Sequence, residues 1–312
     1  MMRGTDAASQ RFLAAVDRLD RDLERIQRQV GSGRRIETPV DAPDDVSPAL
    51  ILRGRLESTL QTLRNLERVK TEVDSGESAI ADVVEAMDRA VSLGTRGATE
   101  TQTVAGRDGL GQQIQMILEE AVAASAIVID GRHIFSGDND GTAPYKLNLG
   151  LPNGVEDYQG SASTRRIAHP SGERFAVGRT AQQLFDEPGA SVFAALNRLR
   201  AALANGPVEG SATYEADYAA QSDEIASAVA DVKNAQNHLG RELAGFGAQQ
   251  ERVNHAINFA NKEVVRHRTE LSSLEDTDVT AAIIELQTAV VHRDAALGVR
   301  SKMPQGSLFD YL

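Results

Sequence analysis

The feature that most constrains this chain is a thin apolar stripe near its start. Between Phe12 and Val30, apolar residues recur every three or four positions, and charged or amide side chains fill most of the places between them. This spacing is close to the period of about 3.5 residues that defines a coiled coil, and one helix cannot bury such a stripe alone. The sequence therefore predicts a partner helix. The stripe consists of Phe12, Val16, Leu19, Leu23, Ile26 and Val30.

A second stripe with the same spacing lies near the other end and predicts that partner. It runs from Val279 to Leu297, and Arg293 occupies one of its positions. If the two helices pair, the fold is mainly α: a long antiparallel helical hairpin or coiled coil formed by the N- and C-terminal regions, with a small β-rich insert in the middle. The apolar members of this stripe are Val279, Ile283, Leu286, Val290 and Leu297.

Between the stripes, the pattern alternates between long helices and one irregular stretch. Glycines and prolines over 31–45 predict an extended connector, and Ser47 followed by Pro48 predicts the start of the second helix. Over 131–179, turn signals and the alternation around 145–149 predict short strands. The remaining helical periods cover 49–96, 107–129, 191–204 and 213–271.

This order of elements predicts three parts. The terminal helices, within 1–40 and 272–312, have stripes too thin for independent stability, so we expect them to be mobile in the monomer and to become ordered on assembly. A helical core domain is expected over 41–137 and 205–271. A small β insert with a short helix is expected over 138–204.

Composition excludes several classes of function. A net charge of −12 argues against a surface for duplex nucleic acid, and the absence of cysteine excludes disulfides and thiolate sites. No apolar run approaches the roughly 20 residues of a membrane span, so no membrane insertion is expected. The first residues lack the apolar core of a signal peptide, which taken alone predicts a cytoplasmic protein.

We find no pattern typical of a catalytic or metal site. His255 and His267 are too far apart along one helix to share a metal, and Asp41, Asp44 and Asp45 lack the spacing of a calcium loop. No nucleophile elbow, zinc-protease motif or phosphate loop is present. We therefore predict a protein that is not an enzyme and that has no cofactor and no metal.

Four ordered runs resemble the flagellin family. The connector is similar to that family's SGxRI-x-x-P-x-D-x-P run, and 131–137 is similar to GRYIFSG, with His133 where tyrosine is usual. The run 272–278 resembles the S-x-x-E-D-x-D entrance to the last helix, and 65–80 resembles a helix with an internal glycine. The connector residues that carry the resemblance are Gly33, Arg34, Arg35, Ile36, Pro39, Asp41 and Pro43.

The resemblance implies a structural component of the bacterial flagellum. The compact middle with helix 191–204, and the apolar residues Leu308 and Phe309 of the last run, are similar to the members that join hook to filament. Filament flagellin remains an alternative, as does a chemoreceptor-like helical signalling hairpin from another class. The resemblance also implies secretion to the flagellum through the type III apparatus, without a cleaved signal peptide.

The implied partners and surface follow from that family. The partners would be other axial proteins (another hook-associated junction protein and flagellin), further copies of this chain, and an export chaperone. Helix–helix packing with these neighbours would carry the function, with no role for nucleic acid. The predicted assembly surface consists of both stripes together with Leu308 and Phe309.

Overall fold

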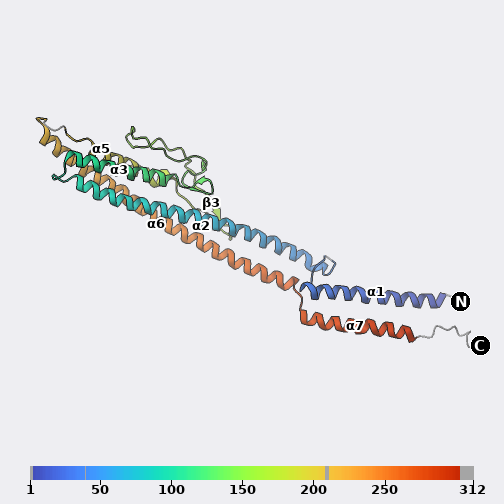
Figure 1. Ribbon diagram of the computed structural model, residues 1–312. Coiled ribbons are helices and arrows are strands. Elements are labelled where there is room, and N and C mark those ends of the chain that lie inside the picture. Colours follow the sequence, from blue (N-terminus) through green and yellow to red (C-terminus); the bar gives the residue numbers. More distant parts are fainter. Residues whose placement is uncertain (1–2, 39, 208–210, 303–312) are drawn as a thin grey trace, which may run out of the picture. The chain divides into compact units, whose positions relative to one another are not determined.

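The computed structural model describes residues 3–38, 40–207 and 211–302 and divides the chain into two compact units (Figure 1). The terminal unit combines 1–60 with 262–312, and the central unit is 61–261. Two long helices, α2 (Pro43–Gly97) and α6 (Tyr214–Glu275), contribute residues to both units.

In the terminal unit, the helices at the two ends of the chain pair with each other. Helix α1 (Arg3–Ser32) lies beside α7 (Val279–Lys302), as Figure 1 shows. An ion pair from Arg25 Nη2 to Glu285 Oε1, 3.4 Å long, links the connector ends of the two helices. The predicted pairing of the two terminal helices is confirmed.

The second helix begins earlier than the sequence pattern indicated. It starts at Pro43, where the N–H groups of Asp45 and Val46 donate to the carbonyl of Ala42, so the predicted start at Pro48 is wrong. Proline is well placed at a first helical position because its missing N–H would have no partner there. The two aspartates that follow also favour this start, since carboxylates stabilise the positive end of a helix.

The central unit is a bundle of antiparallel helices. Within it, Gln236 donates to Asp88 at 2.6 Å and Gln250 donates to Asp74 at 2.7 Å, so α6 runs opposite to α2. Helix α3 (Val104–Ser125) packs against α5 (Val192–Ala204), and the short α4 (Ala181–Phe185) precedes α5.

Small residues allow these helices to approach closely. An added methyl group at Gly94 of α2 would overlap Val229 of α6, and one at Gly97 would overlap Leu203 of α5. Contacts this close bury the surrounding aliphatic side chains, and Leu199, Leu203 and Ala228 are inaccessible to solvent.

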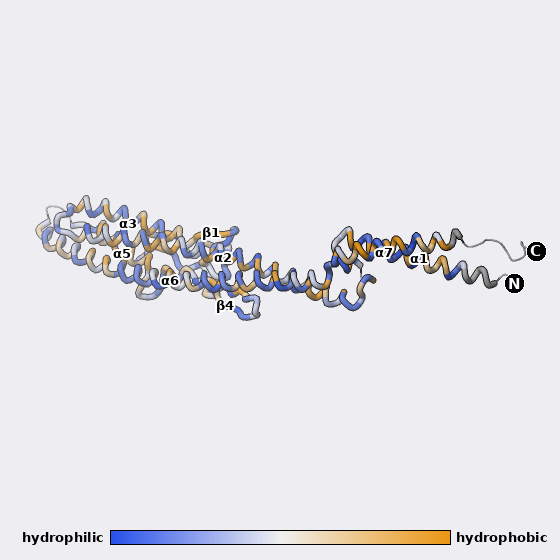
Figure 2. Tube along the Cα trace, turned by 90° about the horizontal axis from the view of Figure 1, so that it is seen from below, coloured by the Kyte–Doolittle hydropathy of each residue, from blue (hydrophilic) through white to orange (hydrophobic). Residues whose placement is uncertain are grey.

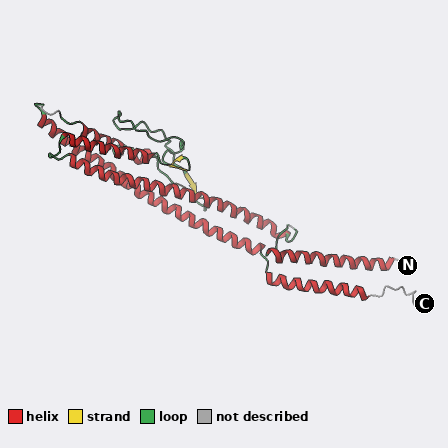
Figure 3. Cartoon of the chain, in the orientation of Figure 1, coloured by secondary structure: helices red, strands yellow, loops and turns green. Residues whose placement is uncertain are grey.

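Two small antiparallel hairpins form the β part of the central unit (Figure 3). Strand β1 (Val128–Ile129) pairs with β2 (Arg132–His133) across a turn at Asp130 and Gly131, which both have positive φ angles, as a two-residue hairpin turn requires. Strand β3 (Arg166–Ala168) pairs with β4 (Arg174–Ala176).

The strand expected from the alternation at 145–149 is reduced to one bridge, between Leu147 and Val155. Tyr145 is buried beside Phe193, with ring centroids 4.9 Å apart, whereas Leu147 is exposed, so the alternating residues do not share one buried face. The predicted mainly α fold, with a helical hairpin and a small β-rich insert, is nevertheless confirmed.

Candidate functional site

The apolar stripe of α1 is buried most deeply at the connector end of the helix. Leu23 and Ile26 are 4% and 1% exposed, and the other four stripe residues are partly buried. Because α1 packs against α7, the stripe that lacked a partner in the sequence finds one within the chain. The remaining partly buried positions are Phe12, Val16, Leu19 and Val30.

The contact face of α7 differs from the predicted stripe. Leu286 and Val290 are partly buried, but Val279, Ile283 and Leu297 are 42%, 40% and 47% exposed. The less exposed positions instead include three alanines at helical spacing, which allow close approach to α1. These alanines are Ala282, Ala289 and Ala296.

A second apolar face of α7 is therefore left uncovered within the terminal unit. Ile284 and Val291 are 60% and 64% exposed and lie seven residues apart, on the same side of the helix. Figure 2 shows hydrophobic residues in orange along much of α7. A helix that is apolar around much of its circumference needs more than one partner. The exposed apolar residues of this face, called the outer face of α7 below, are Val279, Ile283, Ile284, Val291 and Leu297.

The connector folds back on the turn between α6 and α7. The N–H groups of Arg35 and Ile36 donate to the carbonyl of Glu275 at 2.5 and 3.4 Å, and Thr277 N–H donates to Gly33 O at 3.0 Å. Gly33 has a φ of 71°, which an L side chain adopts only with strain. These backbone contacts join the connector between α1 and α2 to the turn between α6 and α7.

Two arginines reinforce this closure. Arg53 Nε donates to Glu275 Oε1 at 2.7 Å, and the Glu275 side chain is only 6% exposed. Its hydrogen bond to Glu275 raises the pKa of Arg53 above the usual value for arginine, although burial acts in the opposite direction. Arg35 Nη2 donates both to Asp45 and to the carbonyl of Leu274, each at 2.7 Å. We call this set of contacts the connector clasp.

Asp41 holds the shape of the connector. Its Oδ2 accepts the N–H groups of Glu37 at 3.1 Å and Thr38 at 2.6 Å. Burial acts to raise the pKa of Asp41, but the hydrogen bonds from Thr38 and Glu37 outweigh it and hold the pKa below its usual value. Of the other predicted connector residues, Ile36 is buried, Arg34 is exposed, and Pro39 lies outside the described residues.

We expect Asp41→Ala to loosen the connector by about 1 kcal/mol near neutral pH, the usual size of such a side-chain-to-backbone hydrogen bond. Because the folded pKa is depressed, this stabilisation exists above the unfolded value of 3.8 and is lost as pH falls through the folded value. Urea unfolding of both proteins across this range would measure the difference. A difference that persists unchanged in strong acid would contradict this role of the carboxylate.

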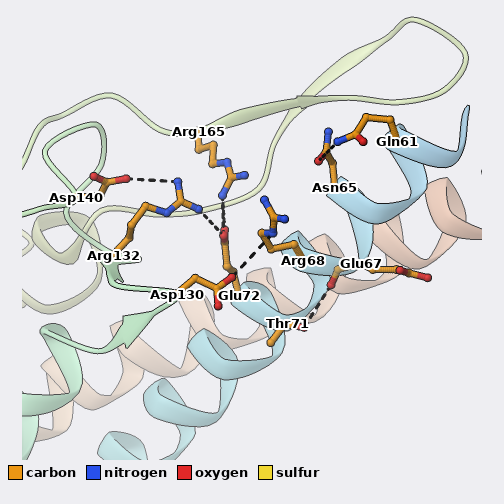
Figure 4. A network of polar contacts seen from close by, with 10 residues as sticks. All are labelled: Gln61, Asn65, Glu67, Arg68, Thr71, Glu72, Asp130, Arg132, Asp140 and Arg165. Carbon is orange, nitrogen blue, oxygen red and sulfur yellow. Dashed lines mark hydrogen bonds and ion pairs between the residues drawn. The ribbon is translucent and has the colours of Figure 1, made fainter. Parts of the chain in front are cut away.

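A polar network attaches the β part to the helices of the central unit (Figure 4). The Glu72 carboxylate accepts Arg165 Nη1 at 2.7 and 2.6 Å and Arg132 Nη2 at 2.8 Å, and Arg132 also contacts Asp140 at 3.4 Å. A cavity of about 60 Å³ lies beside these side chains. Since each guanidinium already has a carboxylate, the network is suited to fixing loops in place rather than to chemistry.

The 131–137 run also has a structural role. His133 Nδ1 is 2.7 Å from the carbonyl of Ala126, and Phe135 is buried with its ring edge-on to Phe185 at 6.0 Å. Gly137 has a φ of 65°, and an added Cβ there would overlap the carbonyls of Ser161 and Ser163. These three residues are thus fixed in place by local packing.

Arg107, near the start of α3, is fully buried, and no pattern in the sequence predicted this. Its Nη1 donates to Gln221 at 2.6 Å, its Nη2 donates to Ser222 at 2.7 Å, and its guanidinium lies 3.8 Å from the centre of the Tyr218 ring. Gln221 in turn donates to the carbonyl of Ala202 at the end of α5. Arg107 therefore ties together three helices: α3, α5 and α6.

Within the described parts of the chain, no group of three or more histidine, cysteine or acidic residues could hold a metal ion. None of the helices described there combines the length and apolarity that crossing a membrane requires.

Comparison with known families gives two matches at the two ends of the chain. The model of the bacterial flagellin N-terminal helical region matches residues 4–140, and that of the bacterial flagellin C-terminal helical region matches residues 225–312. Comparison with curated proteins gives no match.

Several solved structures share the fold at low sequence identity. Flagellar hook associated protein-3 of Legionella pneumophila has a TM-score of 0.62 and 14% identity, with 72% of this chain and 98% of that chain covered. FlgL of Xanthomonas campestris has a TM-score of 0.59 and 14% identity, covering 70% and 97%. The flagellar junction protein FlgL of Legionella pneumophila has a TM-score of 0.56 and 13% identity, covering 66% and 98%.

Proposed function

The chain belongs to the bacterial flagellin family, and from this premise we propose that it is a structural subunit joining the flagellar hook to the filament. It acts by packing against neighbouring subunits and without catalysis. The likeness in fold to proteins named as hook-associated and junction proteins supports the junction over the filament. Membership of this family argues against the alternative of a chemoreceptor-like signalling hairpin.

The observation that carries the proposal is the outer face of α7. It exposes five large apolar side chains on a helix whose other apolar face already packs against α1. An exposed apolar face of this kind marks a protein interaction site. We propose that axial neighbours (another hook-associated junction protein, flagellin, or further copies of this chain) cover it in the assembled flagellum.

In this proposal, the residues of the terminal helices have two different roles. The α1 stripe and the alanines of α7 hold the terminal helix pair together, whereas the outer face meets the neighbours. Leu308 and Phe309, also predicted to take part, lie outside the described residues. The proposal that 1–40 and 272–312 become ordered on assembly requires that the terminal pair be weakly held in the free protein.

Hydrogen exchange on the free protein measures this directly. We expect the amides of α1 and α7 to exchange well before those of α3 and α5, because a two-helix pair buries little surface beside the bundle of the central unit. On assembly, the terminal amides should become protected. Protection of α1 and α7 equal to that of α3 in the free protein would contradict ordering on assembly.

Labelled antibody on intact cells and on cells lacking filaments separates the junction from the alternative, filament flagellin. A short zone of label at the end of the hook, retained without filaments, is expected. Label along the whole filament would instead assign the chain as a flagellin, the reading that the family models by themselves also allow.

The proposal also includes secretion of the chain through the flagellar export apparatus. This secretion uses no cleaved signal peptide and is assisted by a dedicated chaperone. A chain without cysteine can travel unfolded without forming incorrect disulfides. Secretion that stops when the export apparatus is deleted, with the secreted chain retaining its first residues in mass spectrometry, is the expected result.

A further inference from the structure

Two Asn–Gly dipeptides of the central unit differ in how firmly the surrounding structure holds them. They are Asn153–Gly154 and Asn205–Gly206. Glycine after asparagine leaves the next backbone nitrogen unshielded by a side chain and free to rotate. That nitrogen can attack the side-chain carboxamide, provided that the fold leaves both groups able to move.

Asn205 is in the open setting. It is the residue that ends α5, its side chain is exposed, and its own N–H donates to Ala201 O at 3.0 Å. Among the residues that the structure describes, neither its carboxamide nor the N–H of Gly206 has a hydrogen-bond partner. Nothing described there holds the two reacting groups apart.

Asn153 is in the closed setting. The N–H of Gly154 donates to Leu151 O at 3.0 Å, and the carbonyl of Gly154 accepts Asn148 N–H at 2.8 Å. Gly154 is buried with a φ of 76°, packed against Asn197 and Leu118. Attack from this nitrogen requires breaking a hydrogen bond and reorganising a packed turn.

We propose that Asn205 is a site of spontaneous deamidation and that the fold protects Asn153 from the same reaction. The Gly206 nitrogen loses its proton and bonds to Cγ of Asn205, the bond from Cγ to the amide nitrogen breaks, and ammonia leaves. Water then opens the cyclic imide at either carbonyl, giving aspartate or isoaspartate. Only water is consumed, the base that removes the proton is regenerated when ammonia leaves, and no oxidation state changes.

The product changes the end of α5. A new carboxylate stands at the C-terminal end of the helix, where negative charge is unfavourable. Isoaspartate also adds one carbon to the backbone just before Gly206, where an added Cβ would already overlap Val104 of α3. The modification therefore alters a junction between α5 and α3, and it does not depend on the proposed role in the flagellum.

The test is incubation of the full chain in mildly alkaline buffer, followed by peptide mass spectrometry that separates aspartate from isoaspartate. In the folded protein, we expect Asn205 to react about tenfold faster than Asn153, the factor that corresponds to loss of one hydrogen bond. In denaturant the two rates should converge. Asn205→Gln is the matched control and should remove the fast reaction while leaving the slow one.

Three results would overturn the proposal. Equal rates in the folded chain would mean that the fold protects neither site. The same difference in denaturant would assign it to local sequence instead of structure. A folded chain that stays unmodified at Asn205 while the denatured chain reacts would mean that this site is also protected.

Discussion

Replacing Ile284 with aspartate is expected to abolish incorporation of the subunit into the flagellum while leaving the free protein folded. Ile284 is 60% exposed on the outer face of α7, so the new charge stays in water in the monomer. In the assembly, the same carboxylate would be buried among apolar neighbours, at a cost of several kcal/mol for each copy. That cost corresponds to a loss of at least about 100-fold in affinity.

The measurement compares the amount of variant and wild-type protein that sediments with isolated hook–filament structures, alongside thermal unfolding of the free proteins. His292→Asp is the matched control, because His292 is also exposed on α7 but lies roughly 100° around the helix from Val291 and outside the outer face. Normal incorporation of the Ile284 variant, or equal loss with the His292 variant, would contradict the assignment of the outer face.

Aspartate at Leu23 or Ile26 should behave differently. These residues are buried within the terminal unit, so a charge there should separate α1 from α7 even in the free protein, while the β hairpins of the central unit stay folded. The contrast between buried and exposed sites distinguishes a defect in the monomer from a defect in assembly.

The second large effect is expected at Arg107. Truncation to alanine should destabilise the central unit by roughly 3–5 kcal/mol, because it leaves a cavity and removes the hydrogen-bond partner of Gln221 and Ser222. Arg107→Met keeps the apolar stem and removes the buried charge, so its loss should be about half as large. Urea unfolding, followed by near-ultraviolet signals of the tyrosines, measures both.

Arg107→Lys provides a further comparison. Lysine keeps the charge but cannot donate to Gln221 and Ser222 with the same fork of nitrogens. A lysine variant as stable as the wild type would show that the charge above the Tyr218 ring, rather than the hydrogen bonds, is what stabilises this junction. A fully stable alanine variant would contradict the structural role altogether.

The sequence was sufficient for the large elements because their signals are periodic. The spacing of Phe12 to Val30 predicted both a helix and its need for a partner, and the same spacing near Val279 identified that partner. The turn signals over 131–179 predicted short strands, and β3 and β4 lie within that stretch. These are local patterns, and the structure agrees with them.

Features that depend on distant contacts were not visible. The face of α7 that contacts α1 includes three alanines. Because alanine is only weakly apolar, the stronger pattern of isoleucine and valine on the same helix dominates the sequence signal. Nothing around Glu72 or Arg107 indicates that residues far along the chain supply their partners. The prediction of a strand near Leu147 was wrong because packing of Tyr145 against Phe193 determines which residues there are buried. The alternation of apolar and polar residues does not determine it.

The connector clasp has a consequence for the order in which the chain acquires structure. Arg35 and Leu274, which it joins, are 239 residues apart, and Arg25 and Glu285 are 260 apart. Contacts between such distant residues form late in folding, because the entropy cost of closing a long loop comes before the contacts contribute any stability. A chain that emerges from its first residue onward cannot pair α1 until almost all of it has appeared. Helix α1 therefore appears long before the helix with which it pairs, and its place in the terminal unit is fixed late.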